Sequence, residues 1–67
     1  MNNNTFFIVF REPNHTNTIP NPNQDRYGWE LVDNIEYTDY KEANKIREEY
    51  AAAMPKYAVR LRAVPIN

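Results

Sequence analysis

Four segments of this chain carry apolar side chains at regular spacing, and together they predict three strands and one helix. Residues 5–11 are a short run of aromatic and β-branched residues that stops before Pro13, which is typical of a strand. Apolar side chains occupy both alternating faces of this run. We therefore expect it to be a central strand, or one with each face at least partly covered.

A second strand is predicted at residues 27–33, where Trp29 and Leu31 alternate with Glu30 and Val32. The pattern is compatible with an extension to Tyr37, through a bulge or bend at Asp33-Asn34. Residues 57–64 also alternate between two faces and predict a third strand. Pro65 is expected to end this third strand, because proline cannot donate to a strand ladder.

The helix is predicted between residues 39 and 54. Asp39 and Glu42 have the N-cap and N3 spacing of a capping box, and Pro55 forbids a regular continuation. The apolar residues that recur at helical spacing form one stripe: Ala43, Ile46, Tyr50, Ala53 and Met54. This amphipathic pattern predicts that one side of the helix packs on the sheet.

The order strand, strand, helix, strand predicts one small α+β domain over residues 1–67, with a single antiparallel sheet and one helix packed on one face. The doubly apolar first strand suits the middle of the sheet, which gives the spatial order 2-1-3. The alternative order 1-2-3 is less favourable, because it places a strand with exposed Glu30 in the centre. In either order the connection through the helix is expected to be right-handed.

The two faces of this sheet have different predicted roles. The helix is expected to cover the face formed by Phe6, Ile8, Phe10, Trp29, Leu31, Tyr57, Val59 and Leu61. The opposite, open face would carry Phe7, Val9, Arg11, Glu30, Val32, Arg60, Arg62 and Val64. Its apolar centre is ringed by three arginines, and interfaces favour aromatic residues and arginine in this way. We interpret it as a candidate contact surface, with soluble edge-strand arginines as the simpler alternative.

The connection at residues 12–26 holds three of the five prolines and one apolar side chain, Ile19. Structureless connections of this length are uncommon inside compact domains. Three interpretations stay open: a disordered segment, an ordered cover with Ile19 tucked against the sheet edge, or an extended arm that docks on a partner. The arm interpretation adds Ile19 to the candidate partner-binding residues.

Composition excludes several kinds of chemistry. There is no cysteine, which rules out disulfides and thiolate metal sites, and the single histidine cannot form a multi-histidine site in one chain. His15 lies in the polar loop without a predictable partner for nucleophilic catalysis. Gly28 is the only glycine, so a glycine-rich phosphate cradle is absent. We expect no enzymatic activity, no cofactor and no metal.

Charge and hydropathy bear on the partners and the compartment. The net charge is −1 and the sequence pI is about 5.7, without the basic excess of a domain that grips nucleic acid. No apolar run approaches the ~20 residues of a membrane span, and the polar start lacks the pattern of a signal peptide. We therefore expect no membrane association and a cytoplasmic location.

These observations predict a small non-enzymatic protein-binding module, in the role of a regulator or inhibitor of a larger protein or complex. Its candidate partner-binding residues are Phe7, Val9, Arg11, Ile19, Arg60 and Arg62. The alternative is a nucleic-acid-binding protein that uses Phe7, Arg11, Arg60 and Arg62 on the open face. A homodimer formed through Phe7, Val9 and Val32 is a further predicted use of that face.

Overall fold

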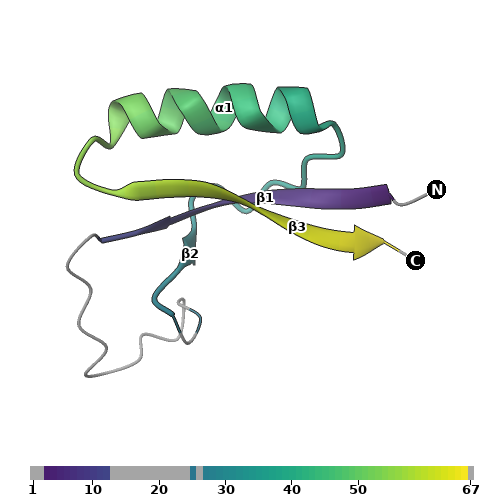
Figure 1. Ribbon diagram of the computed structural model, residues 1–67, viewed down its shortest axis with the longest axis horizontal. Helices are drawn as coiled ribbons and strands as arrows, with labels where there is room; N and C mark the ends of the chain where they lie inside the picture. The colour runs from purple at the N-terminus through teal and green to yellow at the C-terminus, as the bar shows by residue number, and fades with distance from the viewer. Residues whose placement is uncertain (1–2, 13–24, 26, 67) are drawn as a thin grey trace.

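The fold is that of a computed structural model, which describes residues 3–12, 25 and 27–66. Its elements are β1 (Asn3–Arg11), β2 (Glu30–Leu31), α1 (Tyr40–Ala53) and β3 (Ala58–Ile66). The strands form an antiparallel sheet in the order β2-β1-β3. Helix α1 lies along one face of β1 and β3, and the β2 segment descends on the other side (Figure 1). The predicted α+β class and strand order are confirmed.

The central strand β1 is buried from both sides at its middle. Ile8 and Val9 are successive residues, so their side chains point to opposite faces, and they are 0% and 3% exposed. In the register with β3, Ile8 lies opposite Leu61 and Val9 lies opposite Arg60. The expectation of a doubly covered central strand is therefore correct, although only α1 was predicted as a cover.

Strand β2 is shorter than predicted. It comprises only Glu30–Leu31, and the chain returns to β1 at an isolated bridge between Phe6 and Tyr37. Leu31 pairs with Val9, so an uninterrupted register would bring Asn34 opposite Phe6. The pairing with Tyr37 instead means that three extra residues bulge out of the ladder, and Asn34 takes a positive φ of 58° there. The predicted break at Asp33-Asn34 is confirmed.

The predictions that Trp29 and Leu31 face the helix, and that Glu30 and Val32 lie on the open face, are wrong. Cross-strand partners point to the same face of a sheet, and Leu31 pairs with Val9 while Glu30 pairs with Phe10. Leu31 therefore lies on the face opposite α1. Trp29, two residues earlier in the chain, lies on the same face. Alternation tells which residues share a face, but a one-residue shift in register exchanges the two faces.

Helix α1 begins and ends close to the predicted residues. The Asp39 carboxylate accepts a hydrogen bond from the Glu42 backbone N–H at 3.3 Å, which confirms the predicted N-cap. At the other end the Met54 N–H donates to the Tyr50 carbonyl at 2.8 Å, immediately before Pro55. Ala43 is fully buried, which lets the helix approach the sheet closely. No helix in the described part of the chain has the length and apolar character needed to cross a bilayer.

Pro65 does not end β3 as predicted, because it lies on the free edge of the sheet. Phe6 exchanges both backbone hydrogen bonds with Tyr37, so the even-numbered residues of β1 point their peptide groups toward β2. The odd-numbered residues point toward β3, where they meet its even-numbered residues. The odd-numbered residues of β3 then point outward, and the missing N–H of Pro65 interrupts no ladder bond.

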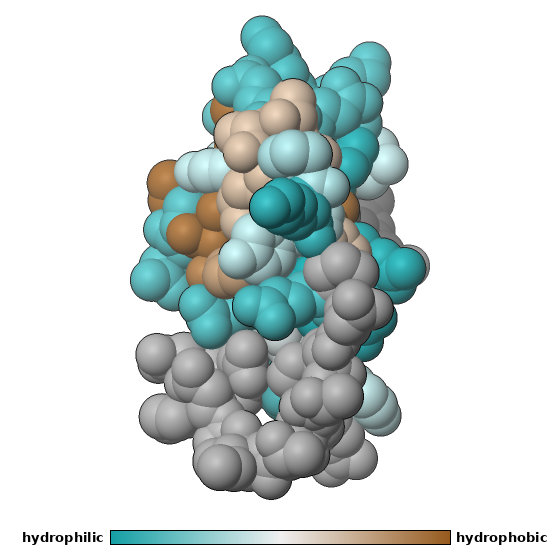
Figure 2. Space-filling model, turned by 90° about the vertical axis from the view of Figure 1, so that its left-hand side faces the viewer, coloured by the Kyte–Doolittle hydropathy of each residue, from teal (hydrophilic) through white to brown (hydrophobic). Residues whose placement is uncertain are grey.

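The described core is small. Its buried apolar residues are Ile8, Val9, Ala43 and Val59. Several large apolar or aromatic side chains are exposed instead: Tyr27, Leu31, Ile35, Tyr40, Tyr57, Val64 and Ile66. Figure 2 views the end where α1 leads into β3, and hydrophobic and hydrophilic residues are interspersed there. Apolar surface is thus left over for contacts outside the core.

Candidate interaction surfaces

A tight turn organised by Asp25 precedes β2. One carboxylate oxygen of Asp25 accepts hydrogen bonds from the backbone N–H groups of Tyr27 and Trp29, each at 2.9 Å. The Asp25 N–H donates to the Trp29 carbonyl at 2.9 Å, and the Gly28 N–H donates to the Asp25 carbonyl at 3.0 Å. Gly28 has a φ of 87°, which glycine adopts without a steric penalty. The turn brings the indole of Trp29 back toward the sheet.

An ion pair ties this turn to the far strand. The Arg62 guanidinium donates a hydrogen bond to the second carboxylate oxygen of Asp25, across 37 positions of sequence. Desolvation by itself raises the pKa of Asp25, but the N–H groups of Trp29 and Tyr27, together with Arg62, outweigh it. The pKa of Asp25 therefore lies below its usual 3.8. The charged form of Asp25 is the one that the fold stabilises.

The other two arginines of this face converge on Trp29. The guanidinium carbon of Arg11 lies 4.5 Å from the centre of the indole ring, and that of Arg60 lies 5.2 Å from it. Both distances are within cation–π range. Arg11 also donates a hydrogen bond to the Tyr27 carbonyl at 3.2 Å. We call the resulting surface the arginine–tryptophan face; it comprises Arg11, Tyr27, Trp29, Leu31, Arg60 and Arg62.

The structure brings together most of the predicted partner-binding residues. By the strand register, the side chains of Phe7, Val9, Arg11, Arg60 and Arg62 all lie on the face opposite α1. Their exposure differs, because Val9 is buried, Arg60 is exposed and the other three are half-buried. Ile19, His15 and the central part of the 12–26 connection lie outside the described residues. These five residues therefore share one face, and the β2 segment lies over part of it.

Tyr27, Trp29 and Leu31 are the members of this face that the strand pattern missed. An available signal was the order Asp25, Gly28, Trp29, since an aspartate that bonds backbone groups two residues on is typical of a turn. A turn at this place reverses the approach of the chain to β2.

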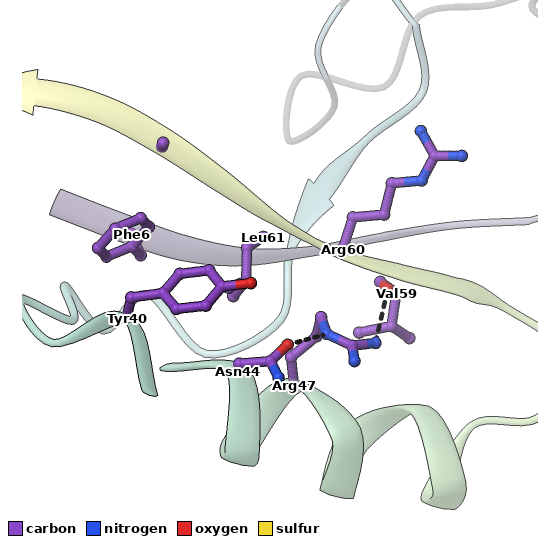
Figure 3. Close-up of a pocket in the computed structure, with 8 residues that line it drawn as sticks. Phe6, Tyr40, Asn44, Arg47, Val59, Arg60 and Leu61 are labelled. Atoms are coloured by element: carbon purple, nitrogen blue, oxygen red, sulfur yellow. Dashed lines mark hydrogen bonds between the residues drawn. The ribbon is translucent and has the colours of Figure 1, made fainter. Parts of the chain in front are cut away.

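A second concave surface runs between α1 and β3. It holds a pocket of about 410 Å³ lined by Phe6, Tyr40, Asn44, Arg47, Val59, Arg60, Leu61 and Ala63 (Figure 3). Arg47 is fixed at its wall by two hydrogen bonds, from Nε to Asn44 Oδ1 at 3.0 Å and from Nη1 to the Val59 carbonyl at 3.5 Å. We call this surface the α1–β3 groove. No motif in the sequence pointed to it.

A third polar cluster is centred on Asp33. One of its carboxylate oxygens accepts hydrogen bonds from the hydroxyls of Tyr37 at 2.7 Å and Tyr50 at 3.3 Å, and the other accepts the Ile35 N–H at 3.2 Å. Desolvation, followed by the hydrogen bond to Asp33, raises the pKa of Tyr37 to about 12. Desolvation and the Asp33 charge also raise the pKa of Tyr50. Both hydroxyls stay protonated and donate, so the cluster links α1 to the 33–36 bulge.

The described residues contain no group of three or more His, Cys, Asp or Glu side chains placed to hold a metal ion. No family model matches the chain, and no curated protein or solved structure matches it. Evidence for the function must therefore come from the surfaces of the molecule. Two of them are open to a partner: the arginine–tryptophan face and the α1–β3 groove.

Proposed function

We propose that this chain is a small non-enzymatic protein-binding module that acts as a regulator or inhibitor of a larger protein or complex. The observation that carries the proposal is the arginine–tryptophan face. There, two guanidinium groups lie against the ring of Trp29, beside Tyr27 and Leu31, which are 61% and 37% exposed. Tryptophan, tyrosine and arginine are the residue types that dominate the binding energy of protein interfaces.

The internal contacts of this face favour binding further. Arg11 is held by Trp29 and by the Tyr27 carbonyl, and Arg62 is held by Asp25. A long side chain that is already ordered loses less conformational entropy when a partner covers it. The Asp25 turn therefore presents a face whose arginines are arranged before the partner arrives.

Nucleic-acid binding through Phe7, Arg11, Arg60 and Arg62 is the less favoured alternative. Arg62 is already neutralised by Asp25 and Arg11 donates to the Tyr27 carbonyl, so within the described residues only Arg60 of this face has no hydrogen bond or ion pair, and one cation holds a phosphate backbone weakly. The net charge of −1 provides no general attraction to a polyanion. If nucleic acid were nevertheless the ligand, its affinity would fall steeply with added salt.

The test is capture of partners from the native cell on the immobilised chain, with and without nuclease, followed by affinity measurement on the recovered protein. We expect nuclease-resistant binding. Tyr27→Ala should weaken it about 30-fold, the effect of truncating a hot-spot residue. Lys45→Ala, an exposed change on α1, is the control and should leave the affinity unaltered. Capture that nuclease abolishes, or equal affinity of the Tyr27 variant, would contradict the proposal.

A further inference from the structure

The outer edge of β3 offers unused backbone hydrogen-bonding groups. Leu61 and Ala63 point their N–H and C=O groups away from β1, as the register and the Phe6–Tyr37 bonds require. The bond from Arg47 to the Val59 carbonyl independently confirms this outward direction. β3 ends the sheet, so no strand within the described residues pairs with this edge. An unpaired edge of this kind is a template for an added strand.

The α1–β3 groove lies directly beside this edge. Leu61 and Ala63 line the groove, and the register turns their peptide groups toward its rim. Tyr40 and Arg47 approach the groove from α1 (Figure 3). Tyr40 is 57% exposed although the edge of its ring packs on Phe6 at a centroid distance of 5.6 Å. Because successive side chains of a strand alternate, every second side chain of an added strand would enter the pocket.

We infer that the free edge of β3 and the α1–β3 groove form a second binding site, adjoining the arginine–tryptophan face at Arg60, for an extended acidic peptide segment. The peptide would add to the sheet as a strand next to β3. Main-chain hydrogen bonds to Leu61 and Ala63 would hold its backbone, and alternate side chains would enter the groove. This is the β-augmentation mode of peptide recognition.

A second copy of this chain is an unfavourable partner for the centre of this edge. If two β3 strands paired with Leu61 opposite itself, Arg60 would face Arg62 of the second copy, and in the next register Arg62 would face itself. Like charges directly opposite are destabilising. One register further, Leu61 lies opposite Pro65, which has no N–H to donate. These registers, which pair the centres of the two β3 strands, are thus unfavourable for a second copy, whereas a strand of different composition avoids them.

Charge selects the acidic class of partner. β3 carries Arg60 and Arg62 and no acidic residue. Arg62 is paired with Asp25, but within the described residues no carboxylate pairs with Arg60. On the groove side, the carboxylate of Glu48 lies 3.8 Å from the Arg47 guanidinium and is largely exposed, so it competes weakly. An Asp or Glu of the added strand would therefore find a cation on either face of β3.

The probe is a random heptapeptide library displayed on phage and selected on the immobilised full chain. We expect the selected peptides to be rich in β-branched residues and to carry Asp or Glu. Ala63→Pro removes an outward N–H that the sheet does not use, as Pro65 already does naturally. It should weaken a selected peptide about tenfold, the effect of one main-chain hydrogen bond. Selected peptides that are basic or carry no charge would overturn the inference. So would a selected peptide that binds the Ala63→Pro variant as tightly as the natural chain.

If circular dichroism shows that Ala63→Pro disturbs the fold, two substitutions of opposite charge at the same exposed position replace it as the test. Ala63→Glu should weaken the selected peptide by repulsion, whereas Ala63→Lys should bind it at least as well as the natural chain. Equal effects of the two variants would contradict an acidic ligand.

Amide hydrogen exchange locates the site. In the free protein the Leu61 and Ala63 amides should exchange faster than those of Arg60 and Arg62, which bond to β1. A selected peptide at about ten times its Kd should slow both outward amides about tenfold, and unchanged exchange would overturn the site. Leu31→Lys, on the other face, should leave peptide binding intact. Failure of the arginine–tryptophan face is thereby distinguished from failure of this second site.

Discussion

At the residue scale, two carboxylates hold segments that the sheet itself does not hold. Asp25 fixes the turn before β2 and bonds to Arg62 on β3, and Asp33 fixes the bulge after β2 and bonds to Tyr50 on α1. Asp25 combines two bonds from backbone N–H groups with one distant partner, and Asp33 combines one such bond and the Tyr37 hydroxyl with one distant partner. The short β2 is therefore anchored at both ends by side chains, which compensates for its few ladder bonds.

The Asp33 cluster predicts an alkaline loss of stability. The pKa of Tyr37 is raised from 10.0 to about 12 in the fold, so the folded state holds this proton more tightly than the unfolded chain. Its contribution is complete below pH 10 and is lost as the pH rises from 10 toward about 12. Tyr37→Phe should cost about 0.5–1.5 kcal/mol at neutral pH and should flatten this alkaline decline in urea unfolding experiments.

Tyr40→Phe is the matched control, because the Tyr40 hydroxyl makes no hydrogen bond within the described residues. It should leave both the neutral stability and the alkaline decline unchanged. If the Tyr37 variant kept the full alkaline decline, the hydrogen bond to Asp33 would not be the cause.

At the element scale, the sheet depends on β1, which alone contacts both other strands and α1. Ile8 is fully buried under α1, while Ile35 in the bulge is 49% exposed. Ile8→Ala should lower the free energy of unfolding by about 2–5 kcal/mol, because it removes buried methyl groups and leaves a cavity. Ile35→Ala should change it by less than about 0.5 kcal/mol. Urea unfolding followed by Trp29 fluorescence measures both.

If Ile8→Ala prevents folding altogether, its free energy of unfolding cannot be measured. Ile8→Val, expected to cost about 0.5–1.5 kcal/mol, then provides the graded comparison. Equal stabilities for the Ile8 and Ile35 variants would contradict the burial that places the core under α1.

The element scale also shows why some strand predictions failed. Alternation identified Trp29 and Leu31 as one set, but the pairing of Leu31 with Val9 decided which face received them. Proline in a strand is unfavourable when its N–H side faces a neighbour. Pro65 faces the free edge of β3 instead, which sequence alone does not reveal.

At the scale of the whole molecule, the chain presents two surfaces on opposite sides of one sheet. The arginine–tryptophan face lies opposite α1, and the groove lies between α1 and β3 at the free edge (Figure 3). An arrangement of this kind allows one partner segment at the edge and another contact on the far face. The Asp25 turn brings the 25–31 segment onto that far face.

The homodimer through Phe7, Val9 and Val32 stays a prediction at this scale. Val9 is only 3% exposed, and Val32 shares the α1 side of the sheet with Glu30, so such a dimer would rely on the exposed rim of the face opposite α1, including Leu31. Light scattering at about 100 μM, a concentration that detects dimers with micromolar Kd, should show a dimeric mass that Leu31→Lys abolishes. Ala63→Pro should leave it unchanged. A monomeric mass in the natural chain would contradict the dimer.

The amino-acid sequence by itself determined the three strands and one helix, the Asp39 cap, the central place of β1 and the arginines of one face. These depend on side-chain period, local capping and short-range turn chemistry, which act within a few residues. Only the tertiary structure decided the face of Trp29, the length of β2, the two carboxylate anchors and the groove beside the β3 edge. Each depends on register or on partners far apart in the chain, such as Asp25 and Arg62 at 37 positions.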